Sequence, residues 1–173
     1  DLIIYQDATL IVEPGVEWIF ETGTGVRVLG SLQINGTADN YIKLTSVAGA
    51  ENETAKWDGL FLDNSSSSSI SYSIIEYASN GIKVFDDTNP SEPIIENNFI
   101  RYNDIGIFVD GNRSSRLYVR NNTVYENNTG IKTYMSEPII INNVIYKNTS
   151  GINVTAWLCG ASSLCNNASP SII

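Results

Sequence analysis

The residues whose types and spacing come closest to a catalytic set are Asp63, Lys83 and Asp110. Each belongs to a short apolar run that opens with glycine. If these runs stack as neighbouring strands, the two carboxylates lie two strands apart, at roughly 9 to 10 Å, with Lys83 diagonally between them. That separation is near the range used in inverting hydrolysis of a glycosidic bond. Phe85 would stand between the carboxylates, however, so we interpret them as a solvated cross-strand charge pattern.

Two further groups of charged residues could carry chemistry. Asp86 and Asp87 begin the segment 86–92, where carboxylates and backbone carbonyls could bind Ca²⁺. The Asp, Thr, Asn and Pro of this segment are more typical of a plain turn. Glu96 and Arg120 occupy equivalent places in neighbouring repeats and predict a surface ion pair worth at most about 1 kcal/mol. We therefore expect no metal site, no cofactor and no enzyme activity.

Composition excludes several function classes. The chain has 173 residues with 42% hydrophobic content, which is enough for one continuous core. It contains no histidine, which excludes Ser-His-Asp and Cys-His catalysis and His-ligated zinc. The net charge of −9 lacks the basic footprint of a nucleic-acid binder. No stretch approaches the roughly 18 to 20 apolar residues of a membrane span.

Cysteines and glycosylation sequons indicate the cellular location of the protein. Cys159 and Cys165 lie six residues apart. This spacing favours a small disulfide loop, worth roughly 2 to 3 kcal/mol, and leaves bonds between chains and free thiols as alternatives. The start at Asp1 fits either a processed N-terminus or an expression boundary. Together with the sequons, these features indicate an extracellular or cell-surface location. The possible glycosylation sites are Asn35, Asn52, Asn64, Asn112, Asn121, Asn127, Asn148, Asn153 and Asn167.

An internal repeat dominates the sequence. One phrase begins at Asn98, Asn122 and Asn143, and a degenerate copy covers 73–82. Within each unit, apolar residues alternate with period two, and no window has helical periodicity. The pattern predicts an all-β fold, a single-stranded parallel β-helix of about six to seven coils. The glycines of the four copies are Gly81, Gly106, Gly130 and Gly151, separated by 25, 24 and 21 residues.

Equivalent positions of the repeat predict the interior of the coils. β-Branched residues at these positions should stack inward. Asn103, Asn127 and Asn148 recur at a bend. We expect them to adopt the left-handed conformation and to form a hydrogen-bonded ladder, with a structural role rather than a ligand-binding one. The expected inward stacks are Ile95, Val119 and Ile140; Ile100, Val124 and Ile145; and Ile107, Ile131 and Ile152.

Large side chains gather at positions that should point outward. Monomeric proteins seldom expose contiguous apolar surface on this scale, so the face could be covered by another subunit, by a sugar polymer, or by segments 47–56 and 156–173. The predicted interface or ligand face consists of Phe61, Lys83, Phe85, Phe108, Lys132 and Tyr134. A second outward group consists of Tyr77, Tyr102, Tyr125 and Tyr146.

Several phrases precede the repeats, at 10–16, 29–37, 42–46 and 57–60. With the Asn-Asn-x-Ile repeats, they resemble the right-handed parallel β-helix repeat of extracellular archaeal and bacterial surface proteins. That family is similar to pectate lyases and to carbohydrate-binding and sugar-hydrolase repeat domains. The resemblance covers about residues 8–155 and implies a right-handed coil. For the lyases, the resemblance implies Ca²⁺ held by carboxylates beside an Arg or Lys base. For the hydrolases, it implies clustered Asp residues on adjacent coils. No such set of residues stands out at equivalent positions of this sequence.

These observations predict one domain, with residues 1–155 as the β-helix and 156–173 as a C-terminal cap or tail carrying Cys159 and Cys165. We expect a secreted structural protein that self-assembles with copies of itself into an extracellular layer, sheath or filament, through its faces and ends. The alternative is a carbohydrate-binding or polysaccharide-degrading module, lyase- or hydrolase-like, with a polysaccharide as its partner.

Overall fold

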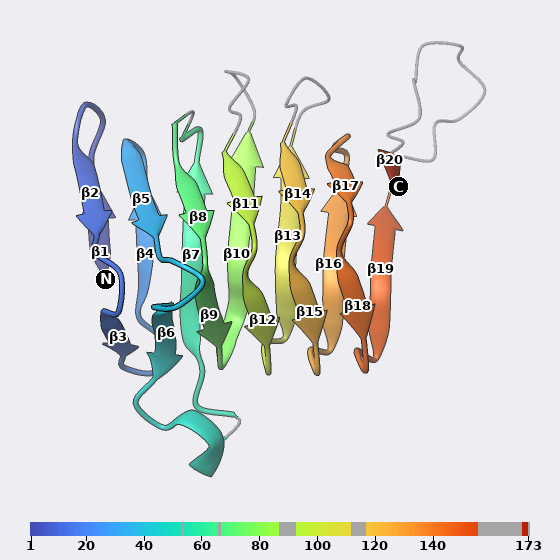
Figure 1. The fold of residues 1–173 in the computed structure, drawn as a ribbon, viewed down its shortest axis with the longest axis horizontal. Coiled ribbons are helices and arrows are strands. Elements are labelled where there is room, and N and C mark those ends of the chain that lie inside the picture. The colour runs from blue at the N-terminus through green and yellow to red at the C-terminus, as the bar shows by residue number, and fades with distance from the viewer. Residues whose placement is uncertain (53, 66, 87–92, 112–116, 156–170, 173) are drawn as a thin grey trace.

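The computed structural model describes residues 1–52, 54–65, 67–86, 93–111, 117–155 and 171–172. In this part of the chain, short strands form three parallel sheets around one core (Figure 1). Successive strands along the chain enter the three sheets in turn, and each pairs with strands of the preceding and following coils. The coils therefore stack along the long axis of a rod, and the predicted parallel β-helix is confirmed.

The three sheets are named here by their strands. Sheet A consists of β1 (Leu2–Ile4), β4 (Gly25–Val28), β7 (Trp57–Asp63), β10 (Ala78–Asp86), β13 (Ile105–Gly111), β16 (Thr129–Tyr134) and β19 (Ser150–Thr155). Sheet B consists of β2 (Thr9–Val12), β5 (Ser31–Asn35), β8 (Ser69–Ser71), β11 (Ile94–Glu96), β14 (Tyr118–Arg120), β17 (Ile139–Ile141) and β20 (Ser171–Ile172). Sheet C consists of β3 (Glu17–Phe20), β6 (Ile42–Ser46), β9 (Ser73–Glu76), β12 (Phe99–Arg101), β15 (Thr123–Tyr125) and β18 (Val144–Tyr146). A 3₁₀ helix, η1 (Gly49–Glu51), follows β6.

The core consists of the inward-facing β-branched residues and leucines of all three sheets. The strand register confirms the three predicted stacks, one in each sheet. Their members are at most 2% exposed through the middle of the rod, whereas Ile145 and Ile152 of the last coil are only partly buried. Since one coil cannot cover its own apolar side, each stack depends on its neighbours along the axis.

The first coils fill their interior with aromatic rings. The Phe20 ring stacks on Trp57 with centres 4.2 Å apart, and Trp18 lies 4.9 Å from Phe20. Trp57 is fully buried, and its Nε1 donates to the Glu76 carbonyl oxygen at 2.8 Å. This pairing satisfies the polar atom of a buried indole.

The repeated glycines allow neighbouring coils to approach closely. A Cβ built on Gly81, Gly106 or Gly130 would lie 2.6 Å from the carbonyl oxygen of the equivalent glycine one coil further on. Such a distance is shorter than any normal carbon–oxygen contact. The glycines that made the repeat visible are therefore required by packing between coils.

The left-handed backbone positions differ from the prediction. Positive φ angles of 53° to 57° occur at Tyr77, Tyr102, Glu126 and Lys147, each of which directly precedes a ladder position. Asn103, Asn127 and Asn148 are not among the positive-φ residues. The turn places the preceding residue in the left-handed region, so that each Asn side chain points inward.

Two residues near the C-terminus lie in one of the three sheets. Strand β20 pairs in parallel with β17, so residues 171–172 return to sheet B. The rest of the predicted cap or tail, residues 156–170 and 173, lies outside the described residues.

Candidate functional site

Sheet A presents outward a column in which cations and aromatic rings alternate. The strand register places side by side Arg27, Phe61, Lys83, Phe108, Lys132 and Asn153. We call these six residues the outer column. Their order is the one that the glycine-led strands predict. The flanking residues of each strand point inward, as strand alternation requires.

Each ring of the outer column lies between two cations. The centre of the Phe61 ring is 5.6 Å from Arg27 Cζ and 5.3 Å from Lys83 Nζ. The centre of the Phe108 ring is 5.0 Å from Lys83 Nζ and 4.8 Å from Lys132 Nζ. Contacts of this kind stabilise exposed side chains by about 0.5 to 1 kcal/mol each. The chain's own contacts therefore order the outer column.

A second outward column lies beside the first and holds the two carboxylates suggested as an acid–base pair. It consists of Asp63, Phe85, Asp110 and Tyr134. Arg27 donates from Nε and Nη2 to Asp63 Oδ2, at 3.0 and 2.5 Å. Lys83 Nζ lies 3.4 Å from Asp110 Oδ2. Each carboxylate thus has its own cation, and Lys83 does not form an ion pair that links the two.

The aromatic rings of sheet A are less exposed than the sequence suggests. Phe61, Phe85, Phe108 and Tyr134 all have intermediate exposure, and the centres of the Phe61 and Phe85 rings are 6.5 Å apart. The face is therefore a mixed surface, in which cationic side chains lie over the Phe61 and Phe108 rings.

The segment 47–56 lies at another place on the rod. The Ser46 hydroxyl donates to the Ala55 carbonyl oxygen at 2.8 Å, and Lys56 Nζ donates to the Tyr102 carbonyl oxygen at 3.1 Å. These contacts hold the segment at the corner where sheet C turns into sheet A.

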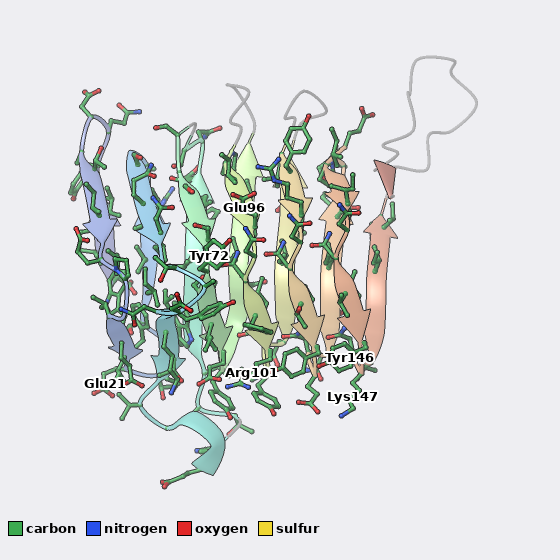
Figure 2. All side chains as sticks on the ribbon, in the orientation of Figure 1. Glu21, Tyr72, Glu96, Arg101, Tyr146 and Lys147 are labelled. Atoms are coloured by element: carbon green, nitrogen blue, oxygen red, sulfur yellow. The ribbon has the colours of Figure 1, made fainter. Side chains whose placement is uncertain are left out.

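The four outward tyrosines form a row along that corner. Successive ring centres are 5.3, 6.4 and 5.1 Å apart from Tyr77 through Tyr102 and Tyr125 to Tyr146. The four tyrosines do not occupy equivalent positions of the repeat. Tyr125 and Tyr146 are the last residues of strands, whereas Tyr77 and Tyr102 lie in turns with left-handed backbone. Tyr146 and Arg101 lie along the same edge of the rod (Figure 2).

Arg101 connects the tyrosine row to a buried carboxylate. Its Nη1 donates to the Tyr125 hydroxyl and its Nε to Glu76 Oε2, both at 2.8 Å. Glu76 is 4% exposed, accepts from the Thr45 hydroxyl at 3.1 Å and lies 3.5 Å from Lys43 Nζ. A buried carboxylate requires such partners. No sequence pattern singled out Glu76, because it lies in the degenerate copy of the repeat.

A polar groove of about 550 Å³ opens beside the tyrosine row. Asp104 lies in it, with Oδ1 3.1 Å from both Lys56 Nζ and Asn128 Nδ2. Tyr102 donates its hydroxyl to Glu126, which raises the pKa of Tyr102 to about 12. The same hydrogen bond lowers the pKa of Glu126. Carboxylate, amide and phenol groups in one groove can hydrogen-bond the hydroxyl groups of a neutral ligand.

The predicted asparagine positions are joined by hydrogen bonds inside the rod. Asn103 donates from its backbone N and from Nδ2 to Asn127 Oδ1, both at 3.0 Å. Asn127 donates in the same way to Asn148 Oδ1, at 3.0 and 2.9 Å. Each Nδ2 also donates to a backbone carbonyl, from Asn127 to Ile100 for example. These side chains stabilise the stacking of coils.

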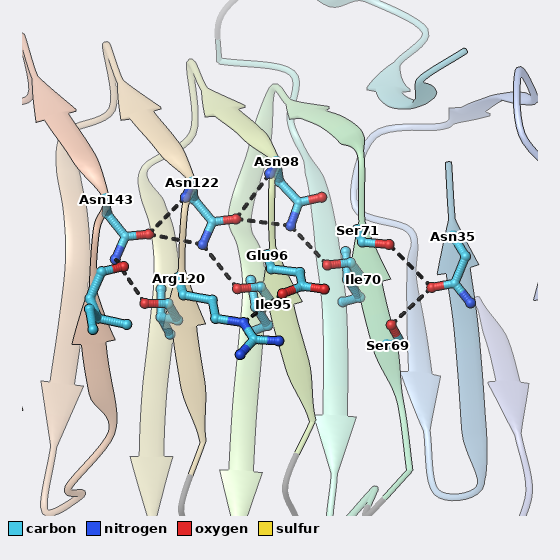
Figure 3. Close-up of polar contacts among 12 residues, drawn as sticks. Asn35, Ser69, Ile70, Ser71, Ile95, Glu96, Asn98, Arg120, Asn122 and Asn143 are labelled. Atoms are coloured by element: carbon cyan, nitrogen blue, oxygen red, sulfur yellow. Dashed lines mark hydrogen bonds and ion pairs between the residues drawn. The ribbon is translucent and has the colours of Figure 1, made fainter. Parts of the chain in front are cut away.

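A second ladder runs through Asn98, Asn122 and Asn143 (Figure 3). Ser73 begins it by donating to Asn98 Oδ1. These asparagines begin the three repeats, but the repeat pattern alone predicted no role for them. Their recurrence five residues before the first ladder was the available signal. Figure 3 also shows the expected ion pair between Glu96 and Arg120.

The predicted glycosylation sites fall into two groups. Asn127 is 4% exposed, and Asn148 Nδ2 donates to the Val124 carbonyl oxygen. A glycan on either Nδ2 would break the ladder, so neither residue suits that role in the folded chain. The remaining described sites are half-buried Asn64 and exposed Asn35, Asn52, Asn121 and Asn153.

Some predicted features lie outside the described residues. They are Cys159, Cys165, Asn112, Asn167 and Asp87. Within the described ranges, no group of three or more Cys, Asp or Glu side chains is placed to hold a metal ion. The same ranges contain no helix with the length and apolar character of a membrane span.

Comparison with known proteins adds the family. A family model described as "Right handed beta helix region" matches residues 30–168. No curated protein and no solved structure matches the chain. The matched segment covers most of the sequence and contains the repeats, the glycines and both asparagine ladders. The chain therefore belongs to the right-handed β-helix family.

Proposed function

We propose that this protein is a secreted structural protein that associates with copies of itself through the outward face of sheet A, as a component of an extracellular layer, sheath or filament. The outer column carries this proposal, because cations and half-buried rings alternate over five neighbouring strands from β4 to β16. Aromatic residues and arginine are enriched in protein–protein interfaces. In this role the chain is not an enzyme and uses no cofactor.

The charge of this face favours a protein partner over an anionic polymer. The two columns of sheet A hold three cations, and two of these are paired with carboxylates. The whole chain carries a net charge of −9, so a polyanion and a second copy are both repelled at a distance, and association must come from the short-range contacts of this face. A nearly neutral surface of rings and paired charges instead fits another folded surface of the same kind.

Replacing both Phe61 and Phe108 by Ser tests the proposal. In sedimentation velocity over a range of concentrations, the parent protein should associate and the double variant should remain monomeric with an unchanged circular dichroism spectrum. Phe99→Ser is the matched control, because Phe99 is 36% exposed on sheet C and should leave association intact. A parent protein that stays monomeric at high concentration would contradict the proposal.

The polar groove supports carbohydrate binding as a second candidate function. Its Asp104, Glu126 and Asn128 side chains can bind sugar hydroxyls beside the ring of Tyr102, and its carboxylates favour a neutral sugar over a uronate.

Calorimetric titration with neutral oligosaccharides tests this second function. Binding should weaken at least tenfold in Asn128→Ala and be unchanged in Glu13→Gln, an exposed acidic residue of an N-terminal turn. Equal affinity in the two variants would exclude the groove as the site. Release of unsaturated products from uronic-acid polymers in the presence of Ca²⁺ would contradict the proposal that the chain is not an enzyme.

A further inference from the structure

Cations and rings alternate regularly along the outer column. From β4 to β16 its side chains run cation, ring, cation, ring, cation. A surface binds a copy of itself through a two-fold axis only if each residue meets a suitable partner in the reversed order. The four members from β7 to β16, which run ring, cation, ring, cation, meet that requirement when the two rods are antiparallel and the axis passes between β10 and β13.

We propose that two copies pack sheet A against sheet A with antiparallel rods, and that the two-fold axis passes between β10 and β13. This inference rests on the proposed self-association and adds its symmetry and register. The register places Lys83 opposite Phe108 of the second copy, and each contact occurs twice. One strand further out, Phe61 lies opposite Lys132. Every cation from Lys83 to Lys132 then meets an aromatic ring.

Two other arrangements of the same face bring together groups that do not complement one another. A two-fold axis through β10 would place Lys83 against Lys83 of the second copy, where like charges repel. With parallel rods, the two columns of one strand would face each other. Phe61 would then meet Asp63, and Phe108 would meet Asp110, so that rings would desolvate carboxylates. The antiparallel register avoids the first cost and halves the second, because it places only Phe85 opposite a carboxylate, Asp110 of the second copy.

The second column is compatible with this register. The axis between β10 and β13 places Asp63 opposite Tyr134 and Phe85 opposite Asp110 of the second copy. Asp63 is only 7% exposed, so Tyr134 would cover a carboxylate that Arg27 already neutralises. At the margin, Arg27 lies opposite Asn153, an exposed amide. Polar groups thus surround the central contacts between cations and rings, as in the rims of known interfaces.

The size of the face suits a dimer. Six strands from β4 to β19 at about 4.8 Å span about 29 Å, and strands of this length give a width of about 20 Å. Each copy would therefore contribute about 600 Å², close to the lower end of specific interfaces. A two-fold contact closes on itself, so a layer requires one further contact through another face.

Spin-label distances test the register. Ile3→Cys and Asn153→Cys, each with both native cysteines replaced by Ser, place a label at the two ends of the face. Neither position belongs to the alternating pattern. With sheets about 10 Å apart, electron–electron resonance should give about 35 Å between the two Ile3 labels and about 26 Å between the two Asn153 labels.

The outcomes separate this inference from the proposed function. Similar short distances at both positions would indicate parallel rods, and a doubled rod length in small-angle X-ray scattering would indicate end-to-end contact. Either result would overturn the antiparallel register while self-association stands. A monomer in sedimentation at the same concentration would instead overturn the proposed function. Circular dichroism of both labelled variants confirms that they fold.

Discussion

Two rows of side chains follow the axis of this rod, and they differ in what surrounds them. The ladder of Asn103, Asn127 and Asn148 is inside, where the first two residues are at most 4% exposed and the amides are hydrogen-bonded. The outer column lies on sheet A, where the rings are half-buried and face solvent on one side. Both rows place one residue on each coil.

This difference separates folding from binding within the same coils. A buried amide that loses its partner leaves a polar group unsatisfied, whereas an exposed cation that loses a ring is solvated by water. We therefore expect changes in the ladder to act on unfolding and changes in the outer column to act on association.

The largest effect should come from Asn127→Leu. This change removes the acceptor of Asn103 and the donor to the Ile100 carbonyl. Each buried group left unsatisfied costs about 1 to 3 kcal/mol, so the free energy of unfolding should fall by about 3 to 5 kcal/mol. Urea unfolding measures it. Asn128→Leu, at an exposed neighbour, should change it by less than about 1 kcal/mol. Equal losses would remove the proposed distinction between inside and outside.

Glu76→Gln should have the next largest effect. Glu76 points outward from sheet C but is almost fully buried by Arg101 and Lys43. Because both cations are partly exposed, we expect a loss of about 2 kcal/mol in the free energy of unfolding. The matched control is Glu96→Gln, whose ion pair with Arg120 is more exposed and should contribute less than about 1 kcal/mol. A larger loss at Glu96 would show that burial does not rank these pairs.

Lys132→Ala should affect stability still less. Its ammonium lies over the Phe108 ring, and an exposed contact of this kind contributes about 0.5 to 1 kcal/mol. Sedimentation should show at least tenfold weaker association. In a two-fold dimer each contact of Lys132 occurs twice, so the variant loses two contacts. A stability loss as large as that of Asn127→Leu would assign the outer column to the fold.

The smallest effect concerns Tyr102, which belongs to the tyrosine row and directly precedes the ladder residue Asn103. Its pKa is raised to about 12 in the folded chain, against about 10 for an unfolded tyrosine. The folded state therefore holds an extra proton between these values. The contribution to stability is complete below pH 10 and is lost as the pH rises through 12. An absorbance titration should show one late tyrosine that is missing from Tyr102→Phe. An unchanged titration curve would contradict this assignment.

The fold was largely predictable because each sequence repeat corresponds to one coil of the rod. The spacing of Gly81, Gly106 and Gly130 marks the coils, and alternation marks the inward residues. The same alternation predicted the order of the outer column. The pairing of residues between neighbouring coils was predictable because each repeat contributes one equivalent strand to each sheet.

What escaped prediction depends on geometry between coils rather than on spacing. Glu76 is buried by side chains from β6 and β12, which no local pattern reveals. Asn127 resembles a glycosylation site in sequence, yet its amide is used inside the rod. The partial cover of the rings on sheet A depends on where Lys83 and Lys132 direct their ammonium groups.

The two asparagine ladders impose a rule on how such a chain can lengthen or shorten. Their members are five residues apart in every coil, at 98 and 103, 122 and 127, and 143 and 148, although the coils themselves differ in length. An insertion between the two positions would prevent both asparagines of that coil from meeting their partners in the neighbouring coils. An insertion after β13 or β16 would only lengthen a turn. Because each amide donates both to the Asn of the following coil and to a carbonyl of the preceding coil, a new coil must enter whole and in the same direction. Duplication of a complete repeat is therefore the natural unit by which this rod can grow.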